Sequence, residues 1–238
     1  MKESRIHPRE DQVAELTRGQ VLPLAPLPET HLTFIAEILT RAWNDLSVHR
    51  SPILGEADEI EVNTLVETRL NALLDEDVRW SQLVSVVARG KETMSYDGRH
   101  LEKQPDLSIY LTNRSPSFPL VVECKLIDAP SRKRIDLYCK DGLMRFVRGE
   151  YAWAVREAFM LAYVRDGSTI SSCLAPFLAH SKARQPDAYL TQSLPNPIVG
   201  SRMQLARSSH GRGFRYVDPG SVPPGEIEIW HLWVAATN

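Results

Sequence analysis

Two carboxylates and one amine occur at a spacing that could hold a divalent cation. Asp106 follows Pro105, 16 residues separate it from Glu123, and Lys125 lies two positions after Glu123. Side chains two apart on a strand leave the same face, so Glu123 and Lys125 are expected side by side. Asp106 begins the adjacent predicted strand and can reach Glu123. Such hard oxygen ligands suit Mg²⁺ or Mn²⁺, and the backbone carbonyl of Cys124 could be a third ligand.

These residues together predict a hydrolytic chemistry. Charges inside an apolar strand are costly to bury unless they have partners, and a divalent cation would compensate the two acids. Lys125 would then position an attacking water or stabilise its deprotonated form, and the metal would neutralise charge on a reacting phosphate. This is what in-line hydrolysis of a phosphodiester requires. The side chain of Cys124 should point to the opposite face, as a small buried hydrophobe.

The elements that must position these side chains can be predicted from periodicity. Residues 107–111 and 120–127 should be strands, the second β-branched and buried, with a loop over 113–119. An amphipathic helix is expected over 58–74, with acids at its start. A long helix is expected over 141–164, although Gly149 lies in its middle.

The remaining segments complete an α/β fold with a mixed central sheet flanked by helices. We expect a helix over 30–46, a loop over 47–58, a strand over 80–89, a turn at Asp97-Gly98, a weak helix over 171–180, a break at Pro195-Asn196-Pro197, and strands over 201–207, 213–217 and 227–233. Residues 1–29 are predicted to be a loosely tied polar arm. Residues 30–238 are predicted to be a single domain, with C-terminal strands and a basic loop over 165–238.

The string Pro105-Asp106…Glu123-Cys124-Lys125 resembles the motif of the PD-(D/E)xK, or restriction-endonuclease-like, nuclease superfamily. The resemblance covers about residues 58–164 and implies an αβββαβ core. It implies that Asp106 and Glu123 are metal ligands and that Lys125 is the catalytic lysine. The alternative is a structural Glu123–Lys125 ion pair on an edge strand, with Asp106 in a turn.

The resemblance also implies two helical contributions to the site. An acid on the preceding helix often completes the metal shell; Glu61 is the first choice, and Glu59 and Glu67 are alternatives. A polar or basic residue on the following helix often reaches the site, and Lys140 is the candidate for aligning the phosphate.

Two local basic zones could contact a nucleic acid. Residues 132–148 carry six cations and two acids, and residues 202–215 carry four arginines and no acid. Phosphate contacts from such residues give affinity that is independent of sequence and falls with salt. The expected DNA-binding residues, including a mobile loop over 209–213, are Arg132, Lys133, Arg134, Arg145, Arg148, Arg207, His210 and Arg212. Each zone could equally be a solvated basic loop.

Composition excludes several classes of protein. The chain of 238 residues has 28 Lys+Arg against 30 Asp+Glu, a net charge of −2, with 43% hydrophobic residues, as in ordinary globular proteins. It shows no apolar run of about 18 residues, no secretory signal and only three cysteines, which favours the cytoplasm and no membrane partner. The phosphate-loop, serine-hydrolase and zincin motifs are absent from the sequence.

The sequence therefore predicts a metal-dependent endonuclease acting on DNA. By analogy with small members of the superfamily, a role in bacterial defence or DNA repair is expected. The alternatives are an inactive nuclease-fold module that binds DNA or a partner protein, and an RNA-cleaving nuclease. Cutting both strands would favour a homodimer, and a partner subunit of a multi-protein system could supply other activities.

Overall fold

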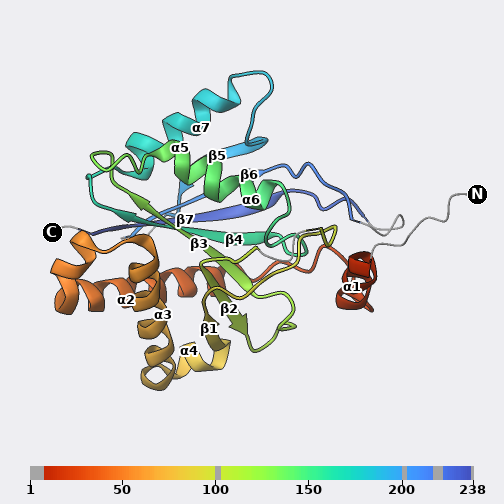
Figure 1. The fold of residues 1–238 in the computed structure, drawn as a ribbon, viewed down its shortest axis with the longest axis horizontal. Coiled ribbons are helices and arrows are strands. Elements are labelled where there is room, and N and C mark those ends of the chain that lie inside the picture. Colours follow the sequence, from red (N-terminus) through yellow and green to blue (C-terminus); the bar gives the residue numbers. More distant parts are fainter. Residues whose placement is uncertain (1–7, 100–102, 200–202, 217–221, 237–238) are drawn as a thin grey trace, which may run out of the picture.

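The computed structural model describes residues 8–99, 103–199, 203–216 and 222–236. These residues contain a seven-stranded mixed sheet with helices on both faces (Figure 1), which confirms the predicted α/β class. The strands run in the order β1-β2-β3-β4-β7-β6-β5. Their bounds are β1 Val84–Ala88, β2 Leu107–Leu111, β3 Leu120–Ile127, β4 Glu157–Val164, β5 Thr191–Pro197, β6 Gln204–His210 and β7 Ile227–Ala235.

The centre of the sheet is parallel and both sides are antiparallel. Strand β4 pairs in parallel with β3 and with β7, whereas β1, β2 and β3 form an antiparallel meander, as do β7, β6 and β5. The central strands read as continuous apolar runs because helices cover both of their faces.

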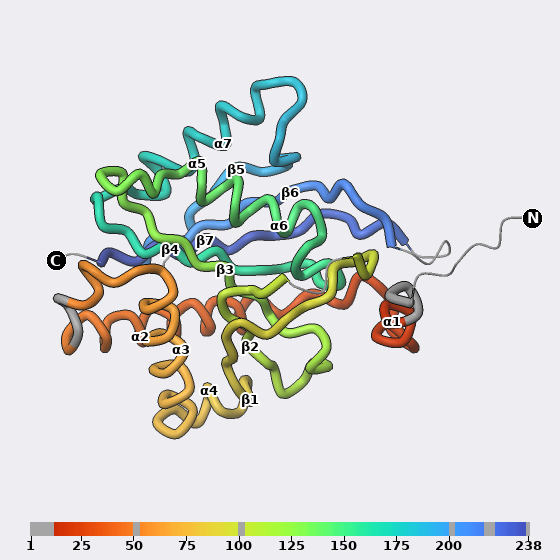
Figure 2. Tube along the Cα trace, viewed as in Figure 1, coloured from red at the N-terminus to blue at the C-terminus, as the bar shows by residue number. Residues whose placement is uncertain are grey.

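Helices divide between the two faces of the sheet (Figures 1 and 2). Helices α2 and α3 cover one face, where Val66 and Leu70 pack with Val122 and Cys124. The other face is covered by α5, η1, α6, η2 and α7, where Tyr138 packs. The bounds are α1 Pro8–Thr17, α2 Glu29–Glu56, α3 Glu59–Glu76, α4 Val78–Leu83, α5 Ile135–Leu137, η1 Tyr138–Leu143, α6 Met144–Val147, η2 Ile170–Leu174 and α7 Ala175–Lys182. No helix in these described ranges is long and apolar enough to cross a membrane.

The strands that carry the motif have the predicted bounds. Strand β2 covers residues 107–111 and β3 covers 120–127, both almost wholly buried. Helix α3 begins at Glu59 because the side chain of Asp58 accepts a hydrogen bond from the Glu61 N–H and caps the helix. The closing strand and the weak helix after residue 170 are also confirmed.

The long helix predicted over 141–164 is wrong. The helical segment ends at Val147, and residues 157–164 form the central strand β4. Gly149 has φ +71°, and a Cβ there would lie 2.6 Å from Cε1 of Phe214, so the chain turns sharply at this glycine. All eight residues of β4 are buried. An apolar run buried on both faces has no period that separates a strand from a helix.

Helix α2 is longer than predicted. Helix α2 continues through residues 47–56, which were predicted to be a loop, and Arg165 donates to the carbonyls of Leu54 and Ala57 at its end.

Part of the strand predicted over 80–89 is helical. Residues 78–83 form α4 because the side chain of Asp77 accepts hydrogen bonds from the N–H groups of Arg79 and Trp80.

Three further predictions differ from the structure. Residues 195–197 belong to β5, whose irregular pairing at the edge of the sheet tolerates proline. Residues 213–216 form no strand, and position 217 lies outside the described ranges. The N-terminal segment contains α1 and is tied to the domain: Val13 is buried, and Leu24 donates its N–H to the carbonyl of Ala154.

Candidate active site at the open edge of β3

The site lies where β2 and β3 separate. Their pairing begins at Leu120 and ends where Leu107 faces Val122. Beyond that point, two carboxylates accept the hydrogen bonds of β3 that a paired strand would otherwise accept. The N–H of Cys124 donates to Oδ2 of Asp106 at 2.8 Å, and the N–H of Leu126 donates to Oε2 of Glu59 at 2.9 Å. The backbone of β3 therefore fixes the positions of two acids at its open edge.

The ammonium group of Lys125 lies at the centre of these acids. Its Nζ lies 2.9 Å from Oε1 of Glu123, 3.1 Å from Oε1 of Glu59 and 3.6 Å from Oδ2 of Asp106. It also donates to the carbonyl oxygen of Cys124 at 2.6 Å. The predicted convergence of Asp106, Glu123, Lys125 and the Cys124 carbonyl is therefore present.

Glu123 is the most deeply buried acid of this cluster. Its side chain is 0% exposed, and its Oε2 has no hydrogen-bond partner. Its Oε1 lies between Lys125 and Nη1 of Arg145, which is 3.0 Å away. Burial raises the pKa of Glu123 to about 8, and Asp106 adds to the rise while Lys125 and Arg145 oppose it. A carboxylate this deeply buried and incompletely paired needs further positive charge to stay ionised at neutral pH.

Lys125 remains a cation in this environment. Burial lowers its pKa, but the charges of Glu123, Asp106 and Glu59 together outweigh burial and raise it above the usual value. Three carboxylates thus face two cations, Lys125 and Arg145. When every group is ionised, the cluster carries one excess negative charge.

Asp106 is held by a hydrogen-bonded chain that the sequence did not reveal. Asn63 on α3 donates from Nδ2 to Oδ1 of Asp106 at 3.0 Å, and the hydroxyl of Tyr163 donates to Oδ1 of Asn63 at 2.9 Å. Asn63 and Tyr163 are buried. Asn63 lies four residues after Glu59, on the same face of the helix, and that spacing was the signal that could have identified it.

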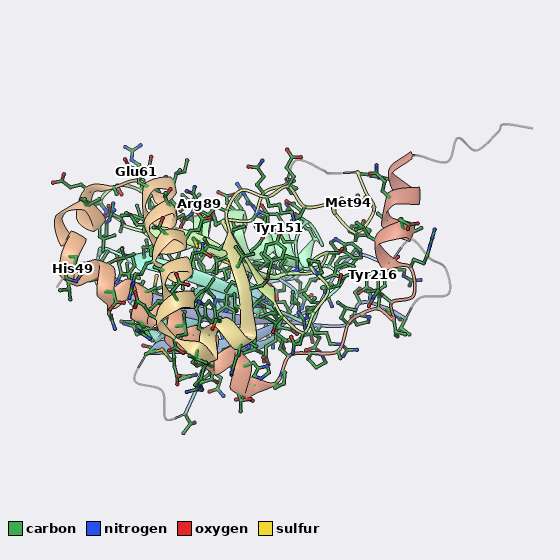
Figure 3. The ribbon with its side chains drawn as sticks, turned by 90° about the horizontal axis from the view of Figure 1, so that it is seen from below. His49, Glu61, Arg89, Met94, Tyr151 and Tyr216 are labelled. Carbon is green, nitrogen blue, oxygen red and sulfur yellow. The ribbon has the colours of Figure 1, made fainter. Side chains whose placement is uncertain are left out.

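The helix acid at the site is Glu59, one of the two alternatives, and not Glu61. The Oε2 of Glu61 accepts a hydrogen bond from the N–H of Asp58 at 3.0 Å, as half of a capping box. Glu61 is exposed at the outer end of α3 (Figure 3). Glu67 lies about two turns further along α3 and also does not enter the cluster.

The basic residue that reaches the site is Arg145, not Lys140. Besides pairing with Glu123, Arg145 donates from Nη1 to the hydroxyl of Tyr151 at 2.7 Å. Tyr151 in turn donates to the carbonyl of Gln104 at 2.8 Å, two residues before Asp106. Lys140 lies on η1 and is exposed. The two cations lie five positions apart in the chain, and Arg145 is the one that reaches Glu123.

A glycine lets the helical segment approach Glu123. A Cβ on Gly142 of η1 would lie 2.6 Å from Cε of Met160 and 3.5 Å from Cγ of Glu123. The backbone of η1 therefore lies close to the buried carboxylate. A larger residue at position 142 would displace the side chain of Met160.

Four of the predicted DNA-binding cations are exposed. Arg132, Lys133 and Arg134 lie in the loop after β3, and Arg148 lies directly after α6. Both positions are close in the chain to site residues, Lys125 in the first case and Arg145 in the second. These cations are available to a polyanion that approaches the site.

The second basic zone serves the fold instead. His210 ends strand β6 and is 0% exposed, so the prediction that it contacts DNA from a mobile loop is wrong. Arg212 donates to backbone carbonyls of residues 152–155 and 224–226, which clasps two loops together. Arg207 pairs with Glu29 at 2.9 Å on the α2 face, away from Glu123. Arg202 lies outside the described residues.

The donors of the cluster suit a hard divalent cation. Carboxylate and carbonyl oxygens are the ligands that Mg²⁺ and Mn²⁺ prefer, and the unpartnered Oε2 of Glu123 leaves one such donor free. Within the described ranges, however, no three His, Cys, Asp or Glu side chains form a group ready to hold an ion. The ammonium of Lys125 lies among the oxygens, and binding an ion there requires this side chain to move.

Comparison with models of protein families, with curated proteins and with solved structures gives no significant match for this chain. The geometry of the cluster is therefore the basis for assigning a function to this chain.

Proposed function

We propose that this chain is a metal-dependent nuclease that hydrolyses DNA phosphodiester bonds. The observation that carries the proposal is the convergence of Asp106, Glu123 and Lys125 at the open edge of β3. Two acids that can hold a divalent cation, with an amine beside them, suit in-line hydrolysis of a phosphodiester. Exposed cations also follow two of the site residues in the chain, Lys125 and Arg145, and suit a polyanionic substrate.

The order of the elements supports a restriction-endonuclease-like core. Helix α3 is followed, after the short helix α4, by β1, β2 and β3, then by the segment α5-η1-α6, and then by β4, which is parallel to β3. This is the αβββαβ order that the motif implies.

The residues of the cluster take distinct roles in this proposal. Asp106, Glu123 and the carbonyl of Cys124 would hold Mg²⁺ or Mn²⁺, which when bound supplies Lewis-acid activation of the phosphate and of the attacking water. Glu59 holds the ammonium of Lys125 near this position, and Lys125 donates a hydrogen bond to the attacking water or to a phosphate oxygen. Arg145 favours the ionised form of the buried Glu123, and a bound cation would supply the remaining positive charge.

A binding module without catalysis is the second candidate. The observation that favours it is the ammonium of Lys125 itself, which already pairs with all three carboxylates. A module of this kind would bind DNA in a salt-sensitive way through its exposed cations, and added Mg²⁺ would change nothing.

Cleavage assays with matched variants separate the two candidates. Plasmid, linear duplex and single-stranded DNA are incubated with Mg²⁺ or with a chelator. We expect the wild type to cleave only with the metal, and Asp106→Asn and Lys125→Met to lose at least about a hundredfold in rate, as when a group that stabilises the transition state is removed. Asp75→Asn and Lys182→Met make the same chemical changes at exposed sites elsewhere and should retain the wild-type rate.

The variants must first be shown to be folded, by circular dichroism and thermal unfolding. Equal cleavage by the wild type and by all four variants, or cleavage that persists in the chelator, contradicts the proposed mechanism. Salt-sensitive binding of DNA without any metal-dependent cleavage favours the binding module.

A further inference from the structure

A cavity of about 480 Å³ lies beside the candidate active site. Its walls come from β2, β3, residues 91–94, residues 116–119, residues 151–155 and Leu16 of α1. Figure 3 shows two of its residues, Tyr151 and Met94, between α3 and α1. The volume is in the range that binds small organic groups in proteins.

Two wall residues of the cavity adjoin residues of the cluster. Val121 lines the cavity and precedes Glu123 by two residues on the same face of β3, a separation of about 7 Å along a strand. Tyr151 also lines the cavity, and its hydroxyl accepts a hydrogen bond from Arg145, the partner of Glu123. The cavity therefore adjoins the cluster through Val121 and Tyr151.

The lining combines flat apolar surfaces with one cation and one acid, Lys91 and Glu92. Aromatic side chains from three separate segments take part, together with a methionine: Tyr110, Phe118, Tyr151, Trp153 and Met94. At the rim, the exposed Lys91 places Nζ 4.9 Å from the centre of the Tyr110 ring. Trp153 donates from Nε1 to the carbonyl of Met94 and thereby fixes the loop that forms one wall. Aromatic rings with a nearby cation are the usual means of holding a nucleobase and its phosphate.

We infer that this cavity takes the base of a nucleotide adjacent to the phosphate that is cleaved. This inference rests on the proposed nuclease function and specifies the substrate further. A base that is stacked and paired within a duplex cannot enter a cavity, so the nucleotide must be single-stranded, at an end, or turned out of the helix. The preferred substrate is therefore DNA with an unpaired nucleotide at the site of cleavage.

Single-stranded oligodeoxynucleotides test this inference when each in turn lacks one base. Binding is measured by fluorescence anisotropy with Ca²⁺, and cleavage is mapped with Mg²⁺. For the wild type, loss of the base next to the cleaved bond should weaken binding about tenfold, because one stacked base contributes on that scale. Loss of a distant base should have little effect.

A variant that fills the cavity provides the matched test. Ser117 is exposed at the rim, so Ser117→Trp should fold normally and abolish the dependence on the missing base, while the abasic oligonucleotide binds unchanged. Gln82→Trp introduces the same side chain at an exposed position of α4 outside the cavity and should behave as the wild type. Lys91→Gln should weaken binding of every oligonucleotide that carries the base.

The outcomes distinguish this inference from the proposed function. Metal-dependent cleavage that is equally fast on every abasic oligonucleotide, and that Ser117→Trp leaves unchanged, overturns the cavity assignment but leaves the nuclease intact. Absence of metal-dependent cleavage by the wild type overturns both.

Discussion

At the scale of single residues, the two neighbouring glutamates at the start of α3 have different tasks. Glu59 turns inward to Lys125 and to the backbone of β3, whereas Glu61 turns outward and caps its own helix. Their separation by two positions places them on different sides of the helix. One residue therefore belongs to the candidate site and the other to the stability of the element that carries it.

We predict that alanine substitutions separate these tasks. Glu61→Ala should lower the free energy of unfolding by about 1 kcal/mol, the usual net contribution of one hydrogen bond, because the N–H of Asp58 loses its acceptor, and should leave cleavage unchanged. Glu59→Ala should slow cleavage at least tenfold, because Lys125 loses a partner and the N–H of Leu126 loses its acceptor. Urea unfolding and Mg²⁺-dependent cleavage measure the two effects. The reverse pattern, with Glu61→Ala inactive and Glu59→Ala fully active, would restore Glu61 as the site residue.

The sequence could identify some site residues and not others. Asp106, Glu123 and Lys125 follow from chemistry and spacing, since strand geometry fixes which side chains share a face. The choice among Glu59, Glu61 and Glu67 depends on the orientation of α3, which tertiary packing determines. Arg145 was expected to contact DNA, because a count of local charge cannot show that one cation of a basic zone turns inward to a buried acid.

At the scale of elements, a buried chain of hydrogen bonds joins β6, β7 and η1. The carbonyl of Tyr189 can only accept, so Nδ1 of His210 must carry a proton. When His210 is neutral, its Nε2 accepts from Ser208, whose oxygen then accepts from Nε2–H of His231. The Nδ1 of His231 accepts from the hydroxyl of Tyr138. The chain is therefore satisfied when both imidazoles are neutral, and protonation of either one breaks a link.

This chain predicts that the fold weakens in mild acid. Burial lowers the pKa of His210 to about 4 and the pKa of His231 well below its usual value. The unfolded chain, with histidine pKa values near 6.5, binds these protons first, so stability is full above about pH 6.5 and falls as the pH decreases toward 4. His210 alone should lose about 2 kcal/mol of stability between pH 7 and pH 5.

Urea unfolding of the wild type and of His210→Asn, at pH values from 7 to 5, measures this effect. Asparagine can keep a hydrogen bond to the Tyr189 carbonyl but does not titrate, so the stability of the variant should depend less steeply on pH. Identical slopes for the two proteins would show that His210 does not remain neutral in the fold.

The elements were predictable to different degrees for a physical reason. Strand β3 has charged residues within an apolar run and turn-forming residues before it, so its bounds were predicted from the sequence alone. Strand β4 is apolar on both faces and follows a helical pattern without a clear break, so periodicity could not separate the two. Helix α4 depends on one side chain, Asp77, that caps it within a β-rich sequence.

At the scale of the whole molecule, the site is assembled from opposite sides of the sheet. Glu59 and Asn63 come from α3 on one face, whereas Arg145 and Gly142 come from the segment on the other. The open edge of β3 is where side chains from both layers reach the same cluster. A net charge of −2 over the chain gives no hint of this arrangement. The local arrangement of charges, here one buried cluster of three acids and two cations, is what the overall charge cannot reveal.

The most direct test of this account is anomalous diffraction from a crystal of the wild-type protein soaked with Mn²⁺. We predict a peak at about 2–2.5 Å from oxygens of Asp106 and Glu123, with the ammonium of Lys125 displaced from its present position among them. A map with no peak at the open edge of β3, in which Lys125 still bridges the three carboxylates, would contradict the central claim that this cluster is a metal site.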